Sequence, residues 1–134
     1  MQYVDTSALI KRYVVESDSV RCTGYLLADL DWVTAGHTLV EVRRTLARLL
    51  PDAAARSSAL ADFAKDWARM YVVELDATTC ESAAAIAEST GARSLDALHL
   101  AAAVRVGGRQ STFLTFDIRQ AQAARALDLV VVGV

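Results

Sequence analysis

The sequence predicts an α/β fold: a three-layer α/β/α sandwich around a central, mainly parallel sheet of five strands. Five short runs of apolar and β-branched residues alternate with segments in which apolar residues recur at helical spacing. The runs are continuously apolar, as expected for parallel strands that are covered on both faces. Such alternation implies right-handed βαβ crossovers. The expected strands are Gln2–Asp5, Trp32–Ala35, Tyr71–Leu75, Thr112–Phe116 and Leu129–Val132.

Helical spacing is clearest in the two segments that follow the second strand. Apolar residues from Leu39 to Leu50 mark a helix that starts near His37, and those from Leu60 to Ala68 mark another. Pro51, the single proline, lies between them and predicts a helix boundary. The other expected helices are Ser7–Val14, Asp18–Leu30, Ala83–Ala87, Ala97–Val104 and Ala121–Leu127.

Length and composition favour one globular domain over residues 1–134. The chain has 54% hydrophobic and 22% charged residues, which argues against disorder. No apolar run approaches the roughly 20 residues that span a bilayer. Asp5 falls where the apolar region of a signal peptide would begin, so we expect a cytoplasmic protein. Cys22 and Cys80 lack metal-binding spacing and are expected to be reduced thiols.

The charge balance permits a nucleic-acid substrate without requiring one. The formal net charge is −2, whereas nucleic-acid binders usually carry a basic excess. If four carboxylates are neutralised at a metal site, the remaining formal charge is +2, and it is carried almost entirely by arginine. Arginine suits phosphate recognition because its planar guanidinium forms bidentate hydrogen bonds.

Two aspartates follow predicted strands and precede predicted helices. Asp5 ends the first strand, and Asp117 closes the fourth in the segment Leu114–Asp117. Each could be an ordinary N-cap, since aspartate is a preferred capping residue. The carboxyl ends of parallel strands meet at one edge of the sheet, where α/β proteins bind ligands. The pair therefore predicts a carboxylate site at that edge more strongly than either residue alone.

Two further acids lie in helices. Asp96 follows Ser94, a good N-cap, in an otherwise apolar segment; it could complement the helix dipole or, if buried, require a metal. Glu41 lies early in the helix after the second strand, where a solvated ion pair with arginine is the simpler interpretation. His99 shares a face with Asp96 and, without a second histidine for a zinc site, is expected to be a satisfied core or rim residue.

The residue types predict a hard metal ion if these acids meet. Four carboxylates without a rival histidine or cysteine cluster select Mg²⁺ or Mn²⁺. One or two such ions can polarise a phosphodiester and activate water. The sequence has no glycine-rich phosphate loop and no nucleophile-elbow motif.

The order of these motifs resembles the PIN-domain nucleases, and more narrowly the toxins of VapBC toxin–antitoxin pairs. Its parts are Tyr3-Val-Asp-Thr-Ser-Ala-Leu9, Leu39-Val-Glu-Val-Arg43, Leu95-Asp-Ala-Leu-His-Leu-Ala-Ala-Ala103 and Leu114-Thr-Phe-Asp117. The resemblance covers essentially the whole chain. It implies an α/β/α sandwich with a parallel sheet and Mg²⁺- or Mn²⁺-dependent cleavage of RNA. It also implies a VapB-type antitoxin as partner and a homodimer.

The resemblance also assigns roles to residues. Our hypothesis is that Asp5, Asp96 and Asp117 bind the metal, directly or through water, and that Glu41 completes the pocket and orients the attacking water. The resemblance itself implies that these four residues form an acidic, catalytic metal-binding pocket. It implies support for that pocket from Thr6, Ser7 and Thr115. We further expect RNA to approach over a basic rim drawn from Lys11, Arg12, Arg43, Arg44, Arg93 and Arg119, with Arg12, Arg43, Arg93 and Arg119 as the candidate RNA-binding residues.

Three alternatives remain open at this point. A housekeeping RNA-processing nuclease would share the chemistry and differ in biology. A nuclease-like domain that only binds a partner would keep the fold without the activity. A receiver-type signalling domain is also α/β, but Asp5 has no acidic neighbour and no lysine follows Lys65.

Overall fold

The computed structural model describes residues 1–134 apart from the side chain of Arg109, and its core is a parallel sheet. The strand order is β3-β2-β1-β4-β5, and each neighbouring pair is parallel. The strands are β1 (Gln2–Val4), β2 (Trp32–Ala35), β3 (Tyr71–Val73), β4 (Thr112–Leu114) and β5 (Val130–Val132). The predicted α/β fold with five strands is therefore confirmed, although four strands are shorter than expected.

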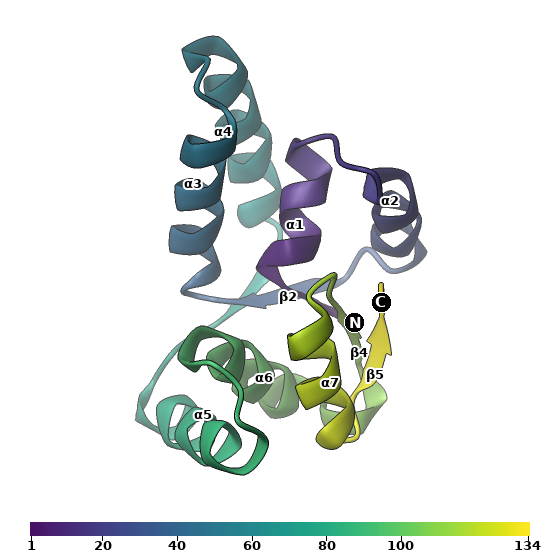
Figure 1. The fold of residues 1–134 in the computed structure, drawn as a ribbon, viewed down its shortest axis with the longest axis vertical. Helices are drawn as coiled ribbons and strands as arrows, with labels where there is room; N and C mark the ends of the chain where they lie inside the picture. The colour runs from purple at the N-terminus through teal and green to yellow at the C-terminus, as the bar shows by residue number, and fades with distance from the viewer.

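Helices cover both faces of the sheet and make the three predicted layers (Figure 1). One layer holds α1 (Thr6–Tyr13), α2 (Ser19–Ala28), α3 (Thr38–Leu49) and α4 (Ala53–Trp67). The other holds α5 (Ala77–Thr90), α6 (Ser94–Val106) and α7 (Ile118–Ala126), with a short 3₁₀ turn at Gly108–Gln110. Within the described part of the chain, no helix has both the length and the apolar character needed to cross a membrane.

The two layers enclose separate halves of the hydrophobic core. On one face, Val4 and Leu114 of the sheet pack with Leu9 of α1 and Leu46 of α3. On the other face, Tyr3, Phe113 and Leu100 pack among the small alanines of α5, α6 and α7. The ring of Tyr3 stacks on Phe113 with centroids 5.3 Å apart. Adjacent residues of β1 thus point to opposite faces, as a strand buried on both sides requires.

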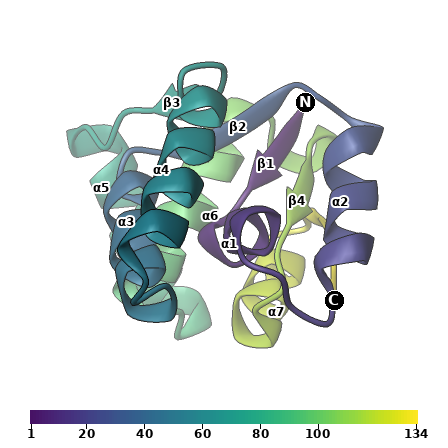
Figure 2. The same ribbon diagram turned by 90° about the horizontal axis from the view of Figure 1, so that it is seen from above.

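The connections reverse direction at the centre of the sheet. From β1 the chain adds β2 and β3 on one side, then crosses to add β4 and β5 on the other. The switch point lies between β1 and β4, whose carboxyl ends are joined by a hydrogen bond from the Asp5 N–H to the Leu114 carbonyl, 3.1 Å long. Figure 2 shows β1 and β4 running together towards the start of α1. Ligands of open α/β sheets bind at this place.

Candidate active site

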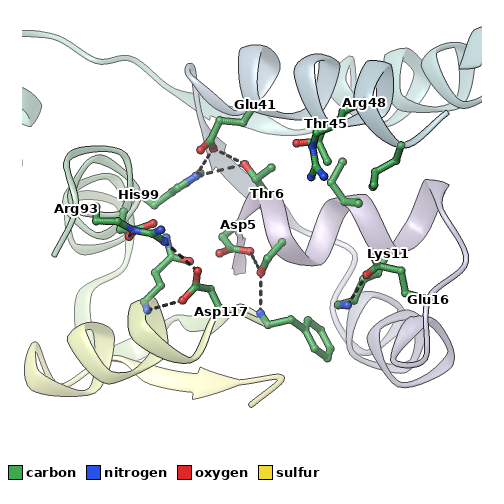
Figure 3. A pocket seen from close by; sticks show the side chains of 16 residues that line it. Asp5, Thr6, Lys11, Glu16, Glu41, Thr45, Arg48, Arg93, His99 and Asp117 are labelled. Carbon is green, nitrogen blue, oxygen red and sulfur yellow. Dashed lines mark hydrogen bonds and ion pairs between the residues drawn. The ribbon is translucent and has the colours of Figure 1, made fainter. Parts of the chain in front are cut away.

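A cavity of about 480 Å³ opens at the switch point, beyond the carboxyl ends of β1 and β4 (Figure 3). All four acids expected from the sequence line it, and they come from four separate segments of the chain. The other polar lining residues are Thr6, Ser7, Lys11, Glu16, Thr45, Arg48, Arg93, His99 and Gln120. Residues distant in sequence therefore meet where the fold predicts a ligand site.

Asp5 is both a helix cap and the most buried of the four acids. Its Oδ1 accepts hydrogen bonds from the backbone N–H of Ala8 at 3.0 Å and from the hydroxyl of Ser7 at 2.7 Å. Its Oδ2 accepts from the hydroxyl of Thr115 at 2.8 Å, and the residue is 3% exposed. Burial raises the pKa of this carboxyl, although the charge of nearby His99 and the three donors act in the opposite direction. A cation beside Asp5 would favour its ionised form.

Two hydroxyls join the end of β1 to the end of β4. Ser7 accepts a hydrogen bond from the N–H of Phe116 at 2.7 Å while its own hydroxyl contacts Asp5. Thr115 accepts from the N–H of Asp117 at 3.0 Å while its hydroxyl faces Asp5. The structure thus places both Ser7 and Thr115 against the first acid. Thr6, the third residue expected to support the pocket, contacts Glu41 instead.

Asp117 repeats the capping arrangement of Asp5 at the start of α7. Its Oδ1 accepts from the N–H groups of Arg119 and Gln120 at 2.8 and 3.1 Å. Its Oδ2 faces the cavity and accepts from Arg93 at 3.1 Å. The side chain is 34% exposed, so solvent reaches it. One oxygen therefore holds the helix, and the other is directed to the site.

Asp96 lies in the first turn of α6, where its side chain is 16% exposed. Arg93 donates through Nε to its Oδ2 at 2.7 Å and, through Nη2, also reaches Asp117. The helix begins at Ser94, and the preceding Arg93 makes no side-chain capping bond, so the expectation that Ser94 is the N-cap was wrong. A guanidinium thus links two of the acids and compensates their charge.

Glu41 does not form the solvated arginine pair that its sequence context favoured. It lies in the first turn of α3, and its Oε2 accepts from Thr6 at 2.5 Å and contacts Nε2 of His99 at 2.8 Å. Burial acts to raise the pKa of Glu41. The hydrogen bond and charge of His99, with the Thr6 hydroxyl, outweigh burial, and the net pKa is lowered. Glu41 is therefore held as an anion at one wall of the cavity.

A histidine pair beside Glu41 is the part of the site that sequence reasoning missed. His99 is 2% exposed, and its Nδ1 lies 2.9 Å from the hydroxyl of Tyr3. The ring of His37 lies 4.1 Å from that of His99, centroid to centroid. Burial, followed by the charge of His99, lowers the pKa of His37 to about 4, so its imidazole is neutral near pH 7. The expectation of no rival histidine cluster was wrong.

The basic residues expected at the rim are distributed unevenly. Arg93 lines the cavity, and Lys11 and Arg48 do so as well. Arg12 instead donates to both carboxylate oxygens of Asp66 at 2.5 and 3.0 Å, away from the cavity lining. Its place in α1, one residue past Lys11, turns it to another side of the helix. The sequence showed that arginines were available but not which partner each would find.

Arg43, Arg44 and Arg119 are exposed and are not among the cavity-lining residues. Arg119 lies on α7 beside a separate hollow, which is lined also by Arg93 and Asp96. Arg48, one turn after Arg44 on α3, reaches the cavity although sequence reasoning did not select it. Helical spacing from Glu41 would have indicated Arg48, since residues seven apart share a helix face.

The donor set fits a hard divalent cation. Three aspartates and a glutamate present carboxylate oxygens to one cavity, and oxygen is the donor that Mg²⁺ and Mn²⁺ prefer. The buried carboxyl of Asp5 is hydrogen-bonded by neutral donors, so a cation beside it would favour its ionised form, whereas Arg93 already compensates the charge of Asp96 and Asp117. The residues present are therefore compatible with a metal-dependent hydrolase.

The PIN domain family matches residues 2–126, and the chain belongs to that family. Ribonuclease VapC35 of Mycobacterium tuberculosis is 34% identical over 99% of this chain and 96% of its own length. Ribonuclease VapC47 of the same species is 31% identical over 97% of this chain and 94% of its own. The chain is thus a VapC-type ribonuclease, of the class that forms the toxins of VapBC systems.

Solved structures show the same fold at lower sequence identity. FitAcB from Neisseria gonorrhoeae superposes with a TM-score of 0.75 at 19% identity, covering 99% of this chain and 97% of that one. VapBC2 from Rickettsia felis, bound to a promoter DNA fragment, gives a TM-score of 0.67 at 15% identity and covers 98% of both chains. These likenesses confirm the α/β/α architecture.

Proposed function

We propose that this chain is a toxin that hydrolyses RNA phosphodiester bonds internally, using Mg²⁺ or Mn²⁺ held at the acidic cavity. The observation that carries the proposal is the convergence of Asp5, Glu41, Asp96 and Asp117 from four segments on one cavity at the switch point. The family membership supports the same chemistry. The PIN-domain match over residues 2–126 favours a nuclease over the alternative of a receiver-type signalling domain.

Each acid has a distinct part in this proposal. Asp5, Asp96 and Asp117 hold the ion, and Asp5 is fixed for this by Ser7, Thr115 and the start of α1. When bound, the ion supplies positive charge that polarises the phosphodiester and activates water. Glu41, kept ionised and oriented by its contacts with Thr6 and His99, accepts a hydrogen bond from the attacking water.

The RNA backbone approaches over the basic side of the cavity. Lys11, Arg48 and Arg93 line it and can contact phosphate oxygens on either side of the scissile bond. Arg119 extends this surface, since it borders an adjoining hollow that Arg93 also lines, whereas the pairing of Arg12 with Asp66 removes Arg12 from it. Contacts of this kind bind RNA through its phosphates and do not read its sequence.

An antitoxin protein of VapB type is the proposed partner. The matching solved structures include FitAcB, VapBC2 and FitAB, and the last two are bound to DNA fragments. We propose an antitoxin complex for this chain, together with a toxin homodimer and a cytoplasmic location. Release of the antitoxin would then expose the acidic cavity to RNA.

The activity is tested by incubating the purified chain with total cellular RNA in Mg²⁺, in Mn²⁺ and in EDTA, and by mapping the new ends. Cleavage should require the metal and fall by at least about 100-fold in Asp96→Asn, since charge-assisted contacts are worth several kcal/mol. The matched control is Asp62→Asn, an exposed carboxylate of α4 outside the cavity lining. Equal cleavage by the wild type and Asp96→Asn would refute the site assignment.

The biological role needs a separate experiment. Expression of the chain should arrest growth, and co-expression of the protein encoded by the neighbouring reading frame should relieve the arrest. Asp96→Asn should not arrest growth. RNA cleavage without growth arrest would favour the housekeeping nuclease, and a partner complex without any cleavage would favour the binding-only alternative.

A further inference from the structure

A second group of metal-ligating side chains adjoins the acidic cavity. His37, Glu41 and His99 each offer one ligand atom, and these atoms all lie within 4.8 Å of one another. His37 precedes α3 and Glu41 lies in its first turn, whereas His99 comes from α6 on the other face of the sheet. The topology that assembles the carboxylates therefore also assembles two imidazoles and a carboxylate.

His37 is an unpartnered buried polar side chain directed at this group. Its side chain is 10% exposed, and among the residues that the structure describes neither of its ring nitrogens has a hydrogen-bond partner. The backbone of Leu95 acts to raise the pKa of His37, but it makes no hydrogen bond of normal geometry with the ring. Its Nε2 faces Glu41 at 3.9 Å. Buried polar atoms normally have partners, so this ring lacks the one that would satisfy it.

The second histidine is already held in an orientation that suits a ligand. Nδ1 of His99 lies 2.9 Å from the Tyr3 hydroxyl, which leaves Nε2 directed at Glu41, 2.8 Å away. Ligating histidines usually bond through the second ring nitrogen to a fixed group, which sets the tautomer. The Tyr3 hydroxyl can accept from Nδ1–H, so Nε2 can give up its proton to become a ligand.

We propose that His37, Glu41 and His99 form a binding site for Zn²⁺ that is distinct from the Mg²⁺ or Mn²⁺ position and shares a wall with it. Two imidazoles and one carboxylate are a zinc ligand set, with a fourth position for water. Bonds of about 2.0–2.1 Å place tetrahedral ligands about 3.4 Å apart. The Glu41–His99 contact at 2.8 Å lengthens and the Glu41–His37 separation at 3.9 Å shortens to reach this geometry.

The shared residue gives the site a consequence for catalysis. Glu41 lines the nuclease cavity, where its carboxylate orients water in the proposed function. A zinc ion on Oε2 neutralises that carboxylate and removes it from the reaction. Zinc binding therefore inhibits RNA cleavage, and this part of the inference rests on the proposed nuclease function.

The two histidines are the only ones in the sequence, which makes a direct measurement on the wild type possible. Metal-free protein is titrated with Zn²⁺ while the imidazole carbon–proton signals are followed by NMR. Both histidine signals should shift together and saturate at one ion per chain. Unchanged histidine signals at saturating Zn²⁺ would overturn the proposal without any variant having to fold.

Variants separate this site from the acidic cavity. His37→Gln should weaken Zn²⁺ binding at least tenfold in calorimetry, whereas Asp96→Asn should change it by less than about threefold. Co²⁺ provides a spectroscopic probe, and its absorption should show nitrogen and oxygen ligation without a thiolate band from the exposed Cys80. Circular dichroism confirms that His37→Gln is folded. Binding lost in Asp96→Asn but kept in His37→Gln would place the ion among the aspartates and refute the site.

Inhibition is measured as the ratio of cleavage rates with and without equimolar Zn²⁺ at fixed Mg²⁺. For the wild type, equimolar Zn²⁺ should lower the cleavage rate at least tenfold. His37→Gln should need at least tenfold more Zn²⁺ for the same inhibition. Tight zinc binding without inhibition would support the zinc site but contradict the inference that zinc inhibits cleavage. Absence of cleavage in Mg²⁺ alone would count against the proposed function, while the binding measurements would still decide the zinc site.

Discussion

The hydroxyl of Thr115 lies 2.8 Å from Oδ2 of Asp5, although 110 residues separate them in the sequence. The same hydroxyl oxygen accepts from the N–H of Asp117. One side chain thus fixes the first acid and the backbone of the last, across the switch point of the sheet. The alignment of the proposed metal ligands depends on this hydroxyl as well as on the carboxylates.

We expect Thr115→Val to lower RNA cleavage about tenfold and to destabilise the fold by about 1–3 kcal/mol, because it leaves buried polar groups without partners. The residue is 0% exposed, and valine fills the same volume. Thr115→Ser keeps the hydroxyl and serves as the matched control. Initial rates and thermal unfolding of both variants test this, and a fully active Thr115→Val would contradict it.

Asp5→Asn should abolish cleavage yet stabilise the metal-free protein. Because the pKa of Asp5 is raised on folding, its contribution to stability is present below about pH 3.8 and is lost as the pH rises through the folded pKa. At pH 7 the buried anion therefore costs stability, and asparagine keeps the cap without the charge. A gain of about 1 kcal/mol would raise the Tm by about 4 °C in EDTA.

The control for this prediction is Asp117→Asn, which changes a more exposed cap and should not raise the Tm. Differential scanning calorimetry at pH 7 in EDTA compares the two variants with the wild type. A lower Tm for Asp5→Asn than for the wild type would show that the ionised carboxylate stabilises the fold even without metal.

Arg93→Gln should reduce the Mg²⁺ concentration needed for half-maximal cleavage about threefold to tenfold. The guanidinium compensates the charge of Asp96 and Asp117, so it competes with a cation at the same oxygens. The expected size is modest because Arg93 is 61% exposed and solvent screens the pair. Arg119→Gln, which changes an arginine outside the cavity lining, should leave the Mg²⁺ requirement unchanged. A higher Mg²⁺ requirement in Arg93→Gln would mean that Arg93 supports metal binding.

Acid should destabilise the metal-free protein partly through His37. Its pKa is lowered from 6.5 to about 4 on folding, so the stability it contributes is present above pH 6.5 and is lost as the pH falls towards 4. His37→Gln should flatten the decline of Tm between pH 6.5 and 4. Thermal unfolding in EDTA across this window measures it, and parallel curves for the two proteins would exclude the effect.

The sequence was informative where local pattern and sheet topology determine the outcome. Asp5 and Asp117 were predicted at one sheet edge because carboxyl ends of parallel strands meet there, and the structure places both in one cavity. The first and fourth strands end earlier than predicted, at Val4 and Leu114, although the N–H groups of Asp5 and Thr115 still donate to the carbonyls of Leu114 and Val132 on the neighbouring strands. Asp117 can cap a helix and line the cavity at once, because its Oδ1 accepts from the backbone of α7 while its Oδ2 accepts from Arg93 in the cavity.

Other features depend on contacts that no local pattern encodes. His37 and His99 are separated by 62 positions and lie on opposite layers, so their approach follows only from the assembled sheet. The sequence also could not predict the partners of the arginines. Arg12 forms an ion pair with Asp66, and Arg93 forms ion pairs with Asp96 and Asp117. Glu41 lines the cavity as expected, but its partners Thr6 and His99 come from other elements and could not be read from its local sequence.

Asp5 and Asp117 are both helix caps and cavity-lining acids, and this combination restricts which substitutions the protein can accept during evolution. A substitution that removes the side-chain oxygen forfeits the start of α1 or α7, so most replacements damage folding as well as chemistry. Asparagine retains one oxygen for the cap and replaces the other by an amide NH2 group, so it keeps the start of the helix while losing the charge and one acceptor. Lineages that abandon cleavage while keeping the protein should therefore carry asparagine at these two positions far more often than alanine or a larger residue.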